Sequence, residues 1–142
     1  MNKMSISKQN LWIKIIASVN GVAAVIHAFF WVLVFVKSPT ISSKENILEK
    51  TNLATTYGFG IADLIWSVPL LVIGSVWLWK KTPIGWLGAQ FANVLYWYSF
   101  TVIITRDFHS GTISPGTMLF LPFAIFSFWA ASFLWKQRSV FF

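Results

Sequence analysis

Long apolar runs alternate with short polar connections along this chain, and the pattern predicts four membrane-spanning helices. The runs cover residues 15–36, 57–79, 84–105 and 118–135. Their lengths match the roughly 20 apolar residues that a helix needs to cross the hydrocarbon core of a bilayer. We therefore expect an all-α membrane protein in which residues 1–142 form one domain, a four-transmembrane-helix bundle with up-down-up-down order.

The connections between the runs predict turns of different kinds. Residues 80–83, KKTP, are too short for anything but a tight antiparallel hairpin. In the segment 37–56, Ser42 and Glu45 have the spacing of a capping box, which predicts a short separate helix at the outer membrane interface. The Gly-, Ser- and Pro-containing segment 106–117 is typical of a loop.

Composition restricts the class of protein. Of the 142 residues, 56% are hydrophobic, 18% are aromatic and only 11% are charged, which is too little charge to cover a soluble domain. The net charge of +7 would suggest nucleic acid binding in a soluble protein, but the lysines here cluster beside the apolar runs. Basic residues at such positions meet anionic headgroups, so we expect membrane lipid and no nucleic acid as a partner. The chain has no cysteine, and we expect neither a metal nor a cofactor.

The distribution of basic residues predicts the orientation of the bundle. Seven of them lie at the two termini and in the second connection: Lys3, Lys8, Lys14, Lys80, Lys81, Lys136 and Arg138. Four lie in the first and third connections: Lys37, Lys44, Lys50 and Arg106. By the positive-inside rule, we expect both termini in the cytoplasm and the bundle in a bacterial plasma membrane.

The spans contain few strongly polar side chains, and their spacing places them on single helix faces. Asn20 and His27 share a face of the first span, and Asp63 and Trp66 lie three residues apart in the second. Polar and aromatic residues recur at steps of three and four in the third span. We expect seven residues to line a ligand-binding interior: Asn20, His27, Asp63, Trp66, Gln90, Asn93 and Trp97.

Asp63 is the only carboxylate within the predicted spans, and an intramembrane ionisable group is a candidate functional residue. At 1.5 Å per residue, Asp63 lies roughly 10 Å and His27 roughly 13 Å from the outer ends of their spans. A carboxylate deep in a spanning helix costs about 2.5–3.5 kcal/mol, and a donor such as His27 lowers that cost. We predict that the two side chains meet, and both are candidate catalytic residues. The simpler alternative is that they only join helices by a hydrogen bond.

The stretch ADLIWSVPLLVIGSVWLWKKTP, residues 62–83, resembles the second span of the EXPERA membrane family. That family includes the sigma-2 receptor and the emopamil-binding sterol isomerases. In the sigma-2 type, an acidic residue is followed by Leu and, six residues after the acid, by Pro; Asp63, Leu64 and Pro69 match that pattern. The basic turn and Pro122 in the fourth span are also similar. Small bacterial four-span membrane proteins with an acid, a proline and a basic turn look equally similar.

The chain departs from the family in having Asp where Glu is usual, and His27 where sigma-2-like proteins present a carboxylate. The resemblance implies a membrane cavity for sterol-like or cationic amphiphilic ligands, with isomerase activity as one form of it. We expect Asp63 to anchor such a lipophilic molecule, His27 to orient it or share its proton, and Trp66 and Trp97 to flank its apolar body. Two alternatives stay open: a proton-coupled transporter, which would require at least a homodimer, and an accessory subunit whose polar residues only fix packing.

Overall fold

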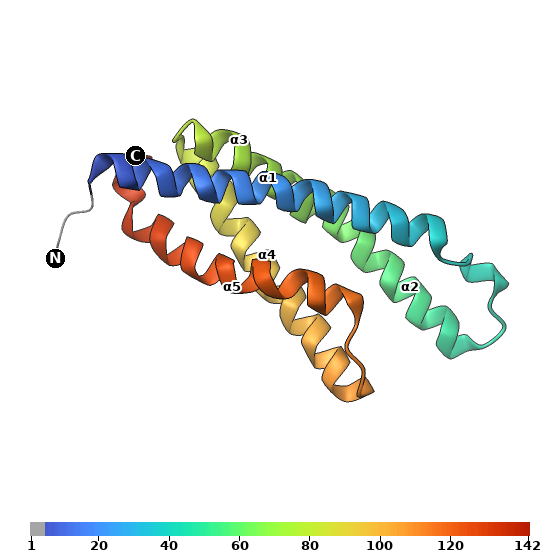
Figure 1. Cartoon of the computed structure of the whole chain (residues 1–142). Helices are drawn as coiled ribbons and strands as arrows, with labels where there is room; N and C mark the ends of the chain where they lie inside the picture. Colours follow the sequence, from blue (N-terminus) through green and yellow to red (C-terminus); the bar gives the residue numbers. More distant parts are fainter. Residues whose placement is uncertain (1–4) are drawn as a thin grey trace.

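The computed structural model describes residues 5–142, which are almost entirely helical (Figure 1). In chain order the elements are α1 (Ile6–Lys37), the 3-10 turn η1 (Ile41–Ser43), α2 (Ile47–Ala62), the π-helical turn η2 (Asp63–Ser67), α3 (Val68–Trp79), α4 (Pro83–Ser110), α5 (Pro115–Lys136) and the 3-10 turn η3 (Arg138–Val140). No strand occurs in this part of the chain, so the prediction of an all-helical fold is confirmed for it. Lys3, which contributed to the predicted orientation, lies outside the described residues.

Four helices within residues 5–142 are long and apolar enough to cross a membrane. They are α1, the continuous helix made by α2, η2 and α3, then α4 and α5. Their number agrees with the prediction, but α1 begins at Ile6 rather than at residue 15. A cap rather than hydropathy sets this start, because the Ser5 hydroxyl accepts a hydrogen bond from the Lys8 N–H.

The separate interfacial helix predicted within residues 37–56 does not form. Ser42 belongs to η1, and the helix cap is instead Asn46, whose side-chain oxygen accepts a 2.8 Å hydrogen bond from the Leu48 N–H. From this cap, α2 runs without interruption into η2 and α3. The second spanning helix therefore starts ten residues before the predicted residue 57, at Ile47.

The connection after the third span is shorter than predicted. α4 continues to Ser110, and Gly111 then ends the helix in the left-handed region, at φ 66°. Asp107, in the last turn of α4, accepts a 2.7 Å hydrogen bond from the Ser114 N–H and another bond from the Thr117 hydroxyl. These bonds tie the end of α4 to the start of α5.

The helices pack in a ring in which α3 lies against both α1 and α4, and α4 lies against α5. The start of α1, the C-terminal residue and the α3–α4 turn lie at one end of the bundle, which we call the terminal end (Figure 1). At the opposite end, α1 and α2 lie apart from α4 and α5 (Figure 1). The helices are therefore closest together at the terminal end and spread apart toward the opposite end.

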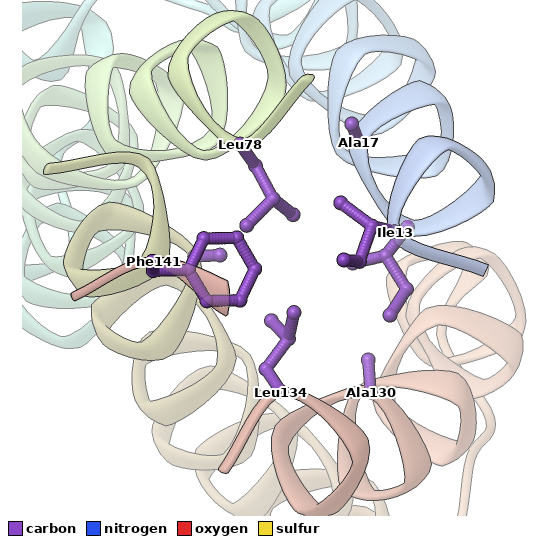
Figure 2. Close-up of a cluster of buried hydrophobic side chains, with 8 residues drawn as sticks. Ile13, Ala17, Leu78, Ala130, Leu134 and Phe141 are labelled. Atoms are coloured by element: carbon purple, nitrogen blue, oxygen red, sulfur yellow. The ribbon is translucent and has the colours of Figure 1, made fainter. Parts of the chain in front are cut away.

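A cluster of buried side chains fills the terminal end (Figure 2). Its members are Ile13, Ile16, Ala17, Leu78, Ala89, Ala130, Leu134 and Phe141. Phe141 follows η3, turns back into the bundle and is only 4% exposed, although it lies beyond the last predicted span. Close contact of α4 with α3 depends on Gly85, where a Cβ would lie 2.1 Å from the backbone nitrogen of Leu78.

Candidate functional site

Asp63 lies midway along the continuous helix from Ile47 to Trp79, where the sequence around it is apolar. Its side chain is 13% exposed and faces α1. The helix is not an ideal α-helix at this point, because Asp63 opens the π-helical turn η2. Single π turns inside α-helices are frequent at functional sites.

The proline six residues after Asp63 accounts for the π turn. Pro69 has no N–H to donate to the carbonyl one turn earlier, and in an α-helix its ring would clash with that carbonyl. The chain responds by widening the preceding turn, so the Val68 N–H bonds to the carbonyl of Asp63, five residues back. The acid–proline spacing noted in the sequence therefore has a local structural effect.

Three side chains contact the Asp63 carboxylate, and two of them, Trp31 and Ser67, donate hydrogen bonds to it. Oδ2 accepts a 2.9 Å hydrogen bond from the Trp31 indole and lies 3.0 Å from Nε2 of His27. Oδ1 accepts a 2.9 Å bond from the Ser67 hydroxyl. His27 and Trp31 lie one turn apart on α1, and both are buried. The prediction that His27 and Asp63 meet is confirmed.

The geometry lets one proton move between the two ionisable groups. The Trp31 indole is a donor only, and it also lies 3.1 Å from Nε2 of His27. When Nε2 carries a proton, it donates to Oδ2 of Asp63, as the Trp31 indole does. When Asp63 is protonated instead, it donates to Nε2, and the heavy atoms need not move. An acid and an imidazole in direct contact form the usual unit of general acid–base chemistry.

A cavity of about 10 Å³ adjoins this cluster on the inner side of the bundle. Its lining combines polar and apolar side chains: His27, Ser67, Leu71, Ala92, Leu95 and Tyr96. A cavity of roughly 10–15 Å³ with two or more polar neighbours suits a single water-sized group. The interior beside the pair is therefore too small for a sterol-sized molecule, and a larger ligand would have to approach Asp63 from the lipid side.

Trp66 does not line the interior, so its predicted placement is wrong. It is 64% exposed on the outer surface of the bundle. In an α-helix, residues three and four apart share a face, whereas the wider π turn brings residues four and five apart together. Ser67 rather than Trp66 therefore lies beneath Asp63.

The predicted residues of the third span form a second group, away from Asp63. The Trp97 indole donates a 2.8 Å bond to the Ser127 hydroxyl and stacks on Phe128, both on α5. Gln90 donates to the carbonyl of Ala131, also on α5, at 3.2 Å. These residues join α4 to α5 and do not complete the Asp63 site.

The two predicted asparagines are buried in the packing between helices. Asn93 is 3% exposed and donates a 3.3 Å bond to the Gln90 side chain. Asn20 is 5% exposed, and its side-chain nitrogen has no hydrogen-bond partner among the described residues. A Cβ on Gly74 would lie 3.0 Å from that nitrogen, so Asn20 packs directly against α3. Of the seven predicted residues, the structure joins His27 to Asp63 and Asn93 to Gln90, and these two pairs belong to separate groups.

Three residues of the cluster were missing from the predicted set: Trp31, Ser67 and Tyr96. Trp31 follows His27 by four residues on the polar face of the first span, and Ser67 follows Asp63 by four. Helical spacing could therefore have found both. Tyr96 comes from α4, and only the packing of α4 against α3 shows that it faces this cavity.

Comparisons with family models, with curated proteins and with solved structures gave no match to this chain. The resemblance to the EXPERA family therefore rests on the residues named above, which are the motif in the second span, the basic turn and Pro122.

Proposed function

We propose that this chain is an integral membrane protein whose four apolar helices cross the bilayer in up-down-up-down order. Large apolar side chains point outward along the helices; Val25, Phe29 and Ile65 are 70%, 61% and 57% exposed. Such a surface suits lipid, whereas in water it would promote aggregation. The acidic residues all lie away from the terminal end, which holds most of the basic ones.

The charge asymmetry favours a cytoplasmic location for both termini. Reporter fusions after Phe142 test this orientation. A reporter that is active only in the cytoplasm should give a signal, and one that is active only in the periplasm should not. Periplasmic activity at this position would contradict the orientation or the number of spans.

Within the membrane, we propose that Asp63 and His27 bind a small lipophilic molecule that carries a cationic or hydrogen-bond-donating group. An ionised carboxylate has about four acceptor positions. Trp31, His27 and Ser67 occupy three of them, which leaves one on Oδ1. Because the Asp63 side chain is 13% exposed, a donor on a ligand in the lipid can reach it. This partly exposed, pre-oriented carboxylate in mid-helix is the observation that carries the proposal.

Packing at the terminal end favours binding over transport. Ile13, Leu78 and Leu134 are each 0% exposed and fill the centre of the bundle there, together with Phe141 (Figure 2). A solute path along the bundle axis would have to pass through this cluster. A proton-coupled transporter would therefore require a large rearrangement or a path between subunits.

A thermal-stability screen in mild detergent tests the binding proposal. Cationic amphiphiles, sterol-like lipids and quinones are added to the wild type, to Asp63→Asn and to the control Asp107→Asn. We expect at least one compound class to raise the melting temperature of the wild type and of the control. The same compounds should leave Asp63→Asn unchanged, because an amide offers one acceptor oxygen fewer and no charge.

Two other results would replace the proposal. Proton-coupled flux in liposomes without stabilisation by any compound would favour the transporter. If no compound stabilises the wild type and no flux occurs, the polar cluster only fixes packing, as in an accessory subunit. Equal stabilisation of wild type and Asp63→Asn would locate the ligand elsewhere on the protein.

A further inference from the structure

A groove of about 570 Å³ lies between α4 and α5, on the side of the bundle away from the Asp63 cluster. Small-molecule sites typically enclose about 300–1,000 Å³. Leu87, Phe91 and Val94 supply an apolar wall, and all three are well exposed on α4. The groove does not include Asp63 or His27, so it is independent of the site described above.

The ends of the groove differ in chemistry. Trp86, Trp135 and Lys136 line it at the terminal end, whereas Val94 and Trp97 line it deeper in the bundle. Indole rings are enriched at the headgroup level of membranes, where one edge is polar and the other apolar. The groove therefore has a polar, cationic mouth and an apolar interior.

The length of the groove fits one leaflet. Trp86 and Trp97 are separated by roughly 16 Å along α4, at 1.5 Å per residue. Half of the hydrocarbon core of a bilayer is about 15 Å thick. A single acyl chain whose headgroup lies beside Trp86 would reach the neighbourhood of Trp97.

The charge at the mouth selects an anionic headgroup. Lys136 is exposed in the last turn of α5, and the guanidinium of Arg138 lies 5.5 Å from the centre of the Trp135 ring. The four acidic residues of the chain, Glu45, Glu49, Asp63 and Asp107, all belong to the middle of the bundle or its opposite end. Among residues 5–142, no acidic side chain lies at the mouth beside these two cations.

We propose that the α4–α5 groove binds one anionic phospholipid of the surrounding bilayer, with an acyl chain along Leu87, Phe91 and Val94 and the phosphate beside Lys136. This inference uses the membrane insertion proposed above but not the Asp63 site. Loss of lipid binding would therefore leave the binding proposal for Asp63 untouched.

Native mass spectrometry of the full-length protein in non-ionic detergent tests the lipid site. Phosphatidylglycerol and phosphatidylcholine with the same acyl chains are added separately to the wild type and three variants. Lys136→Gln removes the charge at the mouth, Val94→Trp fills the groove, and Lys8→Gln removes a charge on α1 outside it. Lys136 is exposed, so its replacement leaves the fold intact.

We expect the wild type to retain one phosphatidylglycerol and little phosphatidylcholine. One basic residue at a membrane surface contributes a factor of about 5 in affinity, so Lys136→Gln should lower phosphatidylglycerol binding by about that factor. Val94→Trp should remove it, and Lys8→Gln should change it by less than about twofold. Equal retention of the two lipids, or equal effects of Lys8→Gln and Lys136→Gln, would overturn the proposal. So would a dimer that excludes lipid, because the groove would then bind a second copy of the chain.

Discussion

Nε2 of His27 on α1 lies 3.0 Å from Oδ2 of Asp63, at the point where the second helix becomes π-helical. The Trp31 indole donates to the same carboxylate oxygen, and the three polar atoms form a closed triangle. Each group thereby loses water without losing hydrogen bonds, which is the condition for keeping a carboxylate inside an apolar bundle. The same contact makes the energies of the side chains interdependent.

We predict that His27→Ala and Asp63→Asn are non-additive in their effects on the free energy of unfolding. Residues in direct contact usually show coupling of about 0.5 kcal/mol or more. Thermal or denaturant unfolding in detergent of the wild type, the two single variants and the double variant gives the coupling energy. His27→Ala combined with Gln90→Ala is the matched control, because Gln90 bonds to α5 and shares no partner with His27. Additive losses in the first pair would show that the two side chains do not interact in solution.

The roles of two tryptophans should be distinguishable by replacement with phenylalanine. Trp31→Phe removes the N–H that donates to Asp63 and His27, while it keeps most of the apolar volume of the side chain. We expect it to lower the free energy of unfolding by about 1 kcal/mol, the usual scale for an interhelical hydrogen bond in a membrane. Trp66→Phe should change it by less than about 0.5 kcal/mol, because Trp66 is on the outer surface. A larger loss for Trp66→Phe would support the original prediction that this side chain faces inward.

The fold was predictable where it depends on hydropathy. Four apolar runs were enough to anticipate four helices, because spanning length is a property of composition. The helix ends were not predictable in this way. The starts of α1 and α2 depend on Ser5 and Asn46, whose caps lie outside the apolar runs. The end of α4 depends on Gly111, which stops the helix beyond residue 105, the last residue of the predicted span.

The site was predictable only as far as ideal α-helical spacing holds. His27 and Asp63 were paired from their similar depth and scarce polar neighbours, and the structure places them in contact. Trp66 was wrongly predicted to face the interior. Pro69 widens the turn that precedes it in the chain, Asp63–Ser67, and this turn does not have the α-helical period on which the prediction relied. Trp97 and Gln90 were assigned to the interior by their helix face alone. That face turns towards α5, which single-helix periodicity does not reveal.

Two glycines should differ sharply when each is replaced by alanine. At Gly85 a Cβ would lie 2.1 Å from the backbone of Leu78 and of Trp77, and backbone atoms cannot rotate out of the way. Such overpacking costs about 1–3 kcal/mol or more, so Gly85→Ala should strongly lower the melting temperature. At Gly58, on α2, no atom lies within 4 Å of the added Cβ. Gly58→Ala should raise stability by up to about 1 kcal/mol, since alanine is the better helix former.

Unfolding of both glycine variants in the same detergent measures this contrast. Comparable stability of the two would mean that α4 does not approach α3 as closely as the structure shows. Loss of stability in Gly58→Ala alone would indicate instead that α2 packs against another chain in solution.

The last two residues of the described chain provide a test of the terminal cluster. Phe141 is 4% exposed and packs with Ile13, Leu78 and Leu134, whereas Phe142 is 77% exposed. Phe141→Ala should lower the free energy of unfolding by about 3 kcal/mol, the scale for removing a buried aromatic ring. Phe142→Ala loses only an edge contact with Trp86 and should cost no more than about 1 kcal/mol. If the two changes cost the same, the C-terminal segment does not close the bundle. The terminal end would then be open, and the main structural objection to transport along the bundle axis would disappear.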